Sequence, residues 1–205
     1  MKKLKIALGE LLIGKVRAAV RSQIAEAVVP GAGGIAFFGD SITHFAKWDL
    51  LFPGVASRNF GIGGDRTAHL LERVEPVVAM KPEKLFLLIG TNDLNVGFTV
   101  EETAANLDAL VTLLRERLPD CRIYLQGVMP AKRRLAQRIR ALNQRYRQIA
   151  GKHGVSFIDL FPVFDDGTGQ IRAEHTYDVL HLSSAGYIAW RDKIAPFVND
   201  ATGRA

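Results

Sequence analysis

Four short polar stretches of the sequence hold residues that could carry out nucleophilic chemistry. They are residues 39–43, 59–65, 90–93 and 178–181, which read GDSIT, NFGIGGD, GTND and DVLH. Ser41 is the candidate nucleophile, and a serine hydroxyl attacks at neutral pH only when a base takes its proton. His181 is the candidate base, with Asp178 three residues earlier to orient the imidazole and stabilise the imidazolium. The pattern therefore predicts catalysis by a serine nucleophile.

Such chemistry also needs hydrogen-bond donors for the negative charge that forms on the substrate oxygen. The candidates are the backbone N–H groups of Ser41 and Gly64 and the side-chain amide of Asn92, because they follow three neighbouring strands of the expected sheet. Glycine at position 64 lets the backbone approach a substrate closely. These three residues are predicted to form an oxyanion hole.

Each stretch also has a purely structural interpretation. Ser41 could cap a helix after a buried strand, and Asn92 could bond its own backbone in a turn. The glycines at 61–64 could only shape a tight turn, and Asp178 with His181 could be an exposed surface pair. The functional interpretation is favoured because all four stretches are expected on the same rim of one predicted sheet.

Four other polar residues near these stretches are assigned lesser roles. Asp40 and Asp65 are expected to make structural hydrogen bonds, because a charge beside the oxyanion would oppose its formation. Asn59 is expected to support the glycine turn. His175 is the reserve candidate for the base, although it lacks an acid three residues before it.

The segments between the polar stretches alternate between strand and helix patterns. Short apolar runs predict strands at 35–38, 56–60, 85–89, 122–126 and 155–158. Longer patterns predict helices at 66–78, 100–118, 132–150 and 184–198, after an additional N-terminal helix at about 11–28. This order predicts a parallel sheet with helices on both faces. All four polar stretches then lie at the carboxyl ends of strands, where such sheets bind ligands.

Length and composition predict one domain over residues 1–205. The chain has 48% hydrophobic and 23% charged residues, which is ordinary for a globular protein. Its single cysteine excludes an intrachain disulfide. The basic start at Met1 precedes an apolar segment that Glu10 and Lys15 interrupt, so no signal peptide is expected, and no stretch is long enough to span a membrane. A cytoplasmic location is predicted.

The net charge of +6 gathers on one predicted helix. Residues 132–149 carry seven lysines and arginines and no acid, while their apolar residues recur at helical spacing. A solvated basic face is the favoured interpretation, and an acidic partner or lipid headgroup is the alternative. We expect no nucleic-acid partner. The histidines show no metal-ligand spacing with acids or cysteines, so no metal site is expected.

In order and spacing, the four stretches resemble the blocks of the SGNH or GDSL hydrolase family. The resemblance covers about 35–187, and NFGIGGD, GTND and the segment YDVLHLSSAGY look most like the platelet-activating-factor acetylhydrolase catalytic subunits. It implies a flavodoxin-like three-layer α/β/α sandwich with a five-stranded parallel sheet and neither metal nor organic cofactor. Where the family pattern ends in GTNN or GxND, this chain has Asn92 followed by Asp93, so the amide is present.

The expected activity is hydrolysis of small carboxylic esters through an acyl-enzyme. The resemblance points to acetyl or other short acyl groups, and the short connection at 127–131 offers no wall for a long apolar tunnel. Phe161, Phe164 and Tyr177 are candidates for a wall or lid, although core packing is favoured for Phe161. A thioesterase, a lysophospholipase or a carbohydrate O-acetylesterase would use the same triad, and a non-catalytic binding module is the alternative class. A homodimer is left open.

Overall fold

Five parallel strands form one sheet in the order β2-β1-β3-β4-β5. The computed structural model describes residues 2–200, with side chains from residue 14 onward. The strands are β1 (Ile35–Gly39), β2 (Ser57–Gly61), β3 (Lys84–Leu88), β4 (Arg122–Gln126) and β5 (Ser156–Ile158). The chain leaves β1 for β2 on one side and then crosses to β3 on the other. The carboxyl ends of β1 and β3 are therefore the topological switch point of the sheet.

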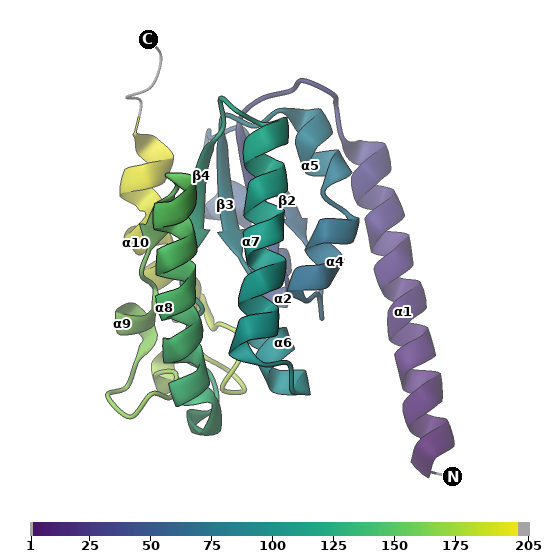
Figure 1. Cartoon of the computed structure of the whole chain (residues 1–205), viewed down its shortest axis with the longest axis vertical. Coiled ribbons are helices and arrows are strands. Elements are labelled where there is room, and N and C mark those ends of the chain that lie inside the picture. Colours follow the sequence, from purple (N-terminus) through teal and green to yellow (C-terminus); the bar gives the residue numbers. More distant parts are fainter. Residues whose placement is uncertain (1, 201–205) are drawn as a thin grey trace.

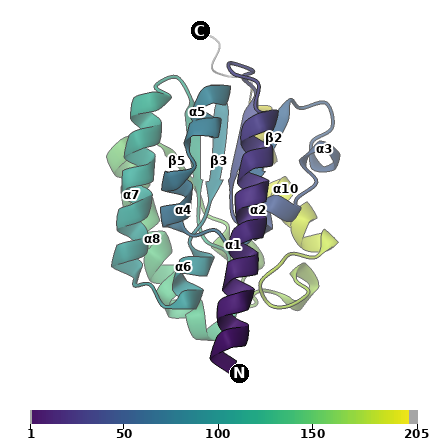
Figure 2. The same cartoon turned by 90° about the vertical axis from the view of Figure 1, so that its right-hand side faces the viewer.

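Helices cover both faces of this sheet (Figures 1 and 2). On one face lie α4 (Thr67–Glu72), α5 (Glu75–Met80), α7 (Val100–Arg117) and α8 (Ala136–His153). On the other lie α3 (Trp48–Leu51), α9 (Phe161–Phe164) and α10 (Ser184–Asn199). Alternate side chains of β1 point to the two faces, so Phe38 packs in the first core and Phe37 in the second. This arrangement confirms the predicted three-layer α/β/α sandwich.

The strand boundaries lie within one residue of the prediction, but some helical segments differ. The helix expected at 66–78 is two helices, α4 and α5, because Pro76 in the first turn of α5 has no N–H to continue a helix from α4. At the break, Arg73 donates to Asp65 and to the carbonyl of Gly39. The helix expected from residue 132 begins at Ala136, after a 3-10 turn over Arg133–Leu135. The sequence analysis missed α2 (Ser41–Phe45) and α6 (Thr91–Val96), which are too short to show helical periodicity.

The N-terminal helix α1 spans Lys2–Ala27, whereas the sequence predicted about 11–28. Residues 2–10 contain no proline and are mostly good helix formers, so the helix begins earlier than expected. It lies beside α4 and α5 and extends beyond the end of the sheet at which α2 and α6 begin (Figures 1 and 2). Ile24 and Val28 pack against the first core. Residue 1 and residues 201–205 of the predicted domain lie outside the described residues.

No helix within residues 2–200 is long and apolar enough to cross a membrane. Several arginines of the basic helix α8 also bind other residues of the protein. Arg138 donates to the carbonyl oxygens of Leu94 and Phe98. Arg140 binds Asp165 at 2.8 Å and Arg147 binds Asp159 at 2.9 Å. These contacts favour the structural interpretation of the basic face over a dedicated site for an acidic partner.

Candidate active site

Ser41 is the first residue of α2, directly after the carboxyl end of β1. The residue that caps this helix is Asp40, whose carboxylate accepts the N–H of Ile42 at 3.0 Å. The Ser41 hydroxyl is therefore free of the capping role and lies 3.0 Å from His181 Nε2. Glycine is required at position 39, because an added Cβ would lie 2.3 Å from the carbonyl oxygen of Leu88 in β3. The close approach of β1 to β3 fixes the turn that presents Ser41.

His181 lies in the loop before α10 and is bound to Asp178 on its other side. Its Nδ1 lies 2.7 Å from Asp178 Oδ2, and its backbone N–H donates to Asp178 Oδ1 at 2.7 Å. When the Nδ1–H donates to the Asp178 carboxylate, Nε2 keeps a lone pair that can accept the hydroxyl proton of Ser41. Val179, between them, has φ +61°. This backbone conformation turns the loop so that the Asp178 carboxylate reaches His181.

Burial of Asp178 acts to raise its pKa, but the side-chain and backbone hydrogen bonds from His181 outweigh this effect. The pKa of Asp178 therefore lies below its usual value, so the carboxylate stays ionised beside the imidazole. An ionised carboxylate at this position stabilises the imidazolium that would form when His181 takes a proton. The three predicted residues thus form one hydrogen-bonded row, Ser41–His181–Asp178.

The glycine turn after β2 lies next to Ser41. A Cβ added at Gly63 would lie 4.0 Å from the Cβ of Ser41, and Gly64 has φ +75°, which favours glycine. Among residues 2–200, the N–H groups of Ser41 and Gly64 have no hydrogen-bond partner. Both donors are therefore available to a substrate oxygen. Their action as an oxyanion hole stays a prediction.

Asn92 is the second residue of α6, after β3. Its Nδ2 donates to the carbonyl oxygen of Asp65 at 2.9 Å and lies 3.5 Å from Asp40 Oδ2. The sequence analysis predicted this amide as an oxyanion donor, and one of its two N–H groups is taken by the backbone of the glycine turn. This bond orients the amide and leaves the second N–H with only the long contact to Asp40.

Asp40 is buried beside the candidate residues. Burial raises its pKa to about 7, although the hydrogen bond from Ile42 acts in the opposite direction. A carboxyl group with this pKa is partly protonated near neutral pH. It therefore places less negative charge beside the predicted oxyanion than an ordinary aspartate would.

The other predicted supporting residues have structural partners. The Asn59 amide donates to the carbonyl oxygens of Thr43, His44 and Ala46, and its Oδ1 accepts the N–H of Gly61. These bonds join the glycine turn to the end of α2, as predicted for Asn59. His175, the reserve base, packs edge-on against Phe164 with ring centroids 5.3 Å apart. The histidine that lies beside Ser41 is His181, with its Nε2 3.0 Å from Ser41 Oγ.

A cavity of about 510 Å³ opens beside the imidazole of His181. Its lining residues are Phe45, Lys47, Tyr177, Asp178, His181, Leu182, Ser184 and Tyr187. The rings of Phe45 and His181 meet edge to face with centroids 5.6 Å apart. Tyr177, with 75% of its surface exposed, lies at the cavity as the predicted wall required, whereas Phe161 and Phe164 are core residues.

The sequence analysis missed Phe45, Lys47 and Tyr187 as site residues. Phe45 was detectable, because position i+4 from Ser41 on a short helix lies one turn away on the same face. Tyr187 belongs to the last resembling segment, and its hydroxyl donates to the carbonyl oxygen of Ile42 at 2.9 Å. No local signal marked Lys47, because only the fold brings it to the His181 loop.

Comparisons with known proteins identify the family. Residues 37–189 match the GDSL-like Lipase/Acylhydrolase family. Platelet-activating factor acetylhydrolase IB subunit alpha1 of Bos taurus is 34% identical over 163 residues, which cover 75% of this chain and 69% of that protein. Subunit alpha2 of Rattus norvegicus is 32% identical, with coverage of 75% and 70%.

Solved structures share the fold. A Streptococcus pneumoniae protein, provisionally described as a platelet activating factor, has a TM-score of 0.88 at 29% identity, covering 96% of this chain and 99% of that chain. An acetylxylan esterase from Geobacillus stearothermophilus has a TM-score of 0.66 at 21% identity, covering 85% and 99%, which is a likeness of fold alone.

Fold and comparisons together define an acylhydrolase with a three-layer α/β/α architecture. The chain belongs to the GDSL-like lipase/acylhydrolase family, as the resemblance of its four polar stretches predicted. Membership supports a hydrolase that acts on esters.

Proposed function

We propose that this protein hydrolyses carboxylic esters with Ser41 as nucleophile, His181 as general acid and base, and Asp178 as the residue that orients the imidazole. The observation that carries the proposal is the continuous row of hydrogen bonds, 3.0 Å from Ser41 Oγ to His181 Nε2 and 2.7 Å from His181 Nδ1 to Asp178 Oδ2. Both distances are within the range for direct proton transfer.

In the first half-reaction, Ser41 Oγ attacks the ester carbonyl carbon while its proton moves to His181 Nε2. The carbonyl oxygen becomes an oxyanion, to which the N–H groups of Ser41 and Gly64 and the amide of Asn92 donate. The intermediate collapses when the bond to the alcohol oxygen breaks, and His181 returns the proton to that oxygen. The products are a free alcohol and an acyl-Ser41 ester.

In the second half-reaction, water takes the place of the alcohol. His181 removes a proton from the water, the resulting hydroxyl attacks the acyl carbon, and the second intermediate expels Ser41 Oγ with the proton from His181. The balance is one ester and one water consumed, with one carboxylic acid and one alcohol released.

A fluorophosphonate probe tests this assignment directly. We expect the probe to attach to Ser41, as located by mass spectrometry, and to block hydrolysis of p-nitrophenyl acetate. Ser184→Ala is the matched control, because Ser184 lies at the same cavity but outside the hydrogen-bonded row, and it should keep both labelling and turnover. Labelling at another serine, or none, would contradict the proposal.

The proposal extends to the acyl group. The alcohol oxygen must lie beside His181 Nε2 to receive its proton, so the cavity at His181 takes the alcohol part of the ester. In the connection after β4, Val128, Met129 and Ala131 are buried in the cores, so these side chains do not build an exposed wall for a long acyl chain. The name acetylhydrolase of the related subunits also supports acetyl or other short acyl groups.

Chain-length dependence tests the acyl assignment. We expect kcat/KM on p-nitrophenyl esters to be highest from acetate to butyrate and to fall for longer chains. A real acyl pocket would instead add up to about 0.8 kcal/mol of binding per methylene. A steady rise through octanoate would therefore refute the short-acyl preference. Acetylated sugars, acyl thioesters and lysophospholipids measured in the same panel separate the three alternative substrate classes.

A further inference from the structure

The carboxylate of Asp65 is fully buried at the end of the glycine turn and is held by two arginines. Arg73 Nε donates to Oδ2 at 2.6 Å. Arg17 donates to Oδ1 through both Nη2, at 2.6 Å, and Nε, at 3.1 Å. His69 Nδ1 lies 3.7 Å from the same oxygen. A buried carboxylate needs such partners, because removing its charge from water is costly unless it is paired.

Asp65 is also linked to the predicted oxyanion donors through its backbone. It follows Gly64 directly, and its carbonyl oxygen accepts the amide N–H of Asn92 at 2.9 Å. Arg73 continues the network, because its Nη2 donates at 2.9 Å to the carbonyl of Gly39, two residues before Ser41. The two arginines and Asp65 therefore connect the turns that carry all three predicted donors.

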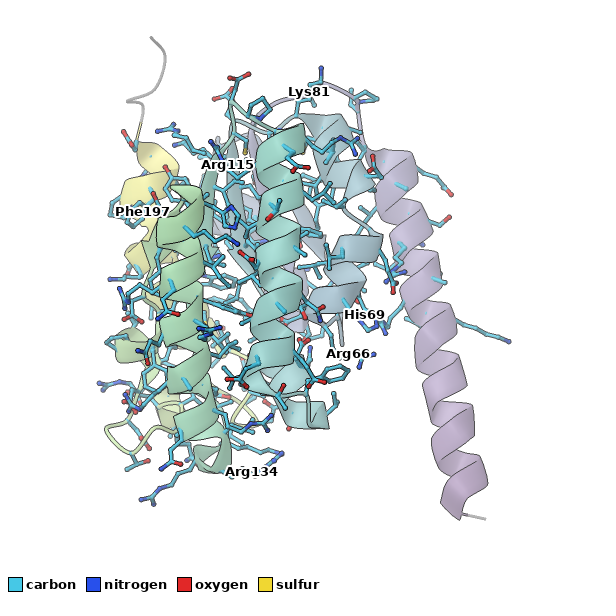
Figure 3. The ribbon with its side chains drawn as sticks, viewed as in Figure 1. Arg66, His69, Lys81, Arg115, Arg134 and Phe197 are labelled. Atoms are coloured by element: carbon cyan, nitrogen blue, oxygen red, sulfur yellow. The ribbon has the colours of Figure 1, made fainter. Side chains whose placement is uncertain are left out.

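Unlike Asp65, Arg73 and Asn92, Arg17 lies in the N-terminal helix. It comes from α1, which lies outside the segment 37–189 that matches the family. The alignment with the Streptococcus pneumoniae structure covers 96% of this chain, so it includes at least part of α1. Arg66 and His69 lie at the end of α4 between the body and α1 (Figure 3), where Arg17 reaches the turn.

We infer that Arg17 is a positioning residue for catalysis, through which the N-terminal helix α1 holds the Gly64 N–H and the Asn92 amide in the geometry needed by the oxyanion. This inference rests on the proposed ester hydrolysis at Ser41. Without Arg17, the Asp65 carboxylate keeps only Arg73 as a close charged partner, and the peptide after Gly64 gains freedom. Oxyanion donors act by being fixed in advance, so a small displacement lowers kcat more than it alters substrate binding.

The chain offers a matched control on the same helix. Arg21 lies one turn further along α1 and pairs with Glu72 of α4, with its Nη2 3.2 Å from Oε2. This pair joins α1 to α4, whereas Arg17 joins α1 to the glycine turn, and the Glu72 side chain is largely exposed. Loss of Arg21 therefore weakens the attachment of α1 without disturbing Asp65.

The experiment compares Arg17→Gln, Arg17→Lys and Arg21→Gln with p-nitrophenyl acetate. We expect Arg17→Gln to lower kcat about 10- to 100-fold with KM within twofold of the original protein. Arg17→Lys should recover part of the loss, because it keeps the charge but not the two-nitrogen contact. Arg21→Gln should keep kcat. Unfolding in urea is measured for each variant, so that only folded protein is compared.

Three outcomes would overturn the inference. Normal kcat in folded Arg17→Gln, or normal kcat in Arg17→Lys where Arg17→Gln does not fold, would show that the contact is structural only. An equal loss of kcat in Arg21→Gln would show that any weakening of α1 has the same effect. In all three cases, fluorophosphonate labelling of Ser41 in the original protein would leave the proposed function standing. Absence of labelling and of turnover in the original protein would overturn the proposed function, and this inference with it.

Discussion

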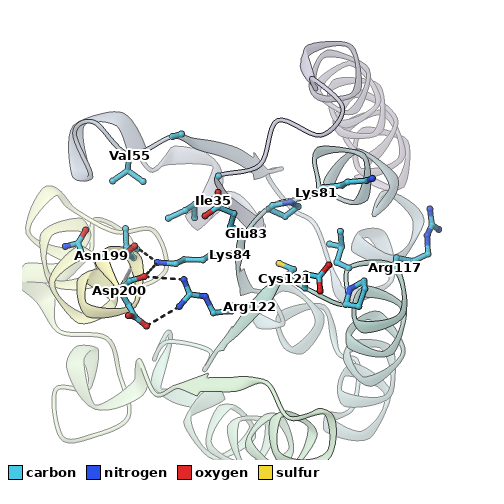
Figure 4. Close-up of a pocket in the computed structure, with 17 residues that line it drawn as sticks. Ile35, Val55, Lys81, Glu83, Lys84, Arg117, Cys121, Arg122, Asn199 and Asp200 are labelled. Carbon is cyan, nitrogen blue, oxygen red and sulfur yellow. Dashed lines mark hydrogen bonds and ion pairs between the residues drawn. The ribbon is translucent and has the colours of Figure 1, made fainter. Parts of the chain in front are cut away.

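Each end of the sheet has a cavity and a buried ionisable residue, but the hydrogen-bond partners of these residues differ between the two ends. At the amino ends of the strands, a cavity of about 1080 Å³ is lined by charged residues that include Lys84 and Arg122 (Figure 4). Lys84 is buried, and its ammonium donates to the carbonyl oxygens of Phe197, Val198 and Asp200 at 2.7 to 2.9 Å. It caps the end of α10, and Arg122 also donates to the carbonyl oxygen of Asp200, at 3.2 Å.

The carboxyl ends of the strands have the smaller cavity, and the pairing of the buried carboxyl groups there is uneven, because Asp65 is held by two arginines whereas Asp40 is not. Asp40 is buried with one short hydrogen bond and one long contact, and the Ser41–His181–Asp178 row ends at an open cavity. At the larger cavity the charges complete the fold, whereas beside the smaller one lie an incompletely paired carboxyl group, Asp40, and the row of residues for which we propose catalysis. The partners of the charges, rather than the volume of the cavity, distinguish the two ends.

The largest effect expected from this contrast is on Ser41 and His181. Ser41→Ala or His181→Ala should each lower kcat by about 10⁴-fold or more, because the two residues act as one unit. The midpoint of urea unfolding should change little, since neither side chain holds two elements of the core together. His175→Ala is the matched control and should retain turnover. Comparable activity in purified Ser41→Ala would rule out the mechanism.

Asn92→Ala should have the next largest effect at the carboxyl end. Loss of one oxyanion donor lowers kcat by about 10²- to 10³-fold with little change in KM. Asn95→Ala is a suitable control, because Asn95 lies on the same short helix but is exposed and binds Arg134. A rise in KM at constant kcat would make Asn92 a ground-state binding residue, and no change would return it to a turn residue.

The pH dependence of stability tests whether the buried Asp40 is incompletely stabilised. Because its pKa is raised to about 7 in the folded protein, the folded state holds a proton that the unfolded chain releases near pH 4. Stability contributed by this group is therefore lost as the pH rises through about 7. Between pH 5 and pH 8 the free energy of unfolding should fall by about 2 to 3 kcal/mol from this group alone.

Asp40→Asn keeps an oxygen for the N–H of Ile42 but cannot ionise. The variant should be more stable than the original protein at pH 8 and similar to it at pH 5, as measured by urea unfolding at each pH. Equal pH dependence in the two proteins would show that Asp40 titrates as an ordinary aspartate.

The smallest expected effect is at the amino end. Lys84→Met should lower the free energy of unfolding by about 2 kcal/mol, because three carbonyl groups lose a charged donor. Its kcat should be unchanged. Lys81→Met is the control, because Lys81 lines the same cavity but is exposed, and it should alter neither quantity. A loss of kcat in Lys84→Met without a loss of stability would mean that the amino end also takes part in catalysis.

The sequence by itself determined the strands and the residues with the chemistry for a site. Strands β1, β3, β4 and β5 were found because each contains a short run of apolar residues, whereas β2 has Phe60 as its only large apolar residue. Ser41, Asn92 and His181 were found because each lies in a short motif at a strand end or in the last loop. These signals are local, so they can be recognised in the sequence without knowledge of the fold. Short helices such as α2 and α6 were missed, since one turn of helix has no periodicity to detect.

Tertiary structure alone decided how these residues are held. Asp65 was expected to make structural hydrogen bonds, but nothing in the sequence indicated that its partners would be Arg17, 48 positions earlier, and Arg73 at a break between two helices. The cavity that joins Phe45 and Lys47 to Tyr187 likewise depends on how α2 packs against α10. Contacts of this kind depend on which elements lie close together in the folded chain. Local residue types and their spacing do not reveal this.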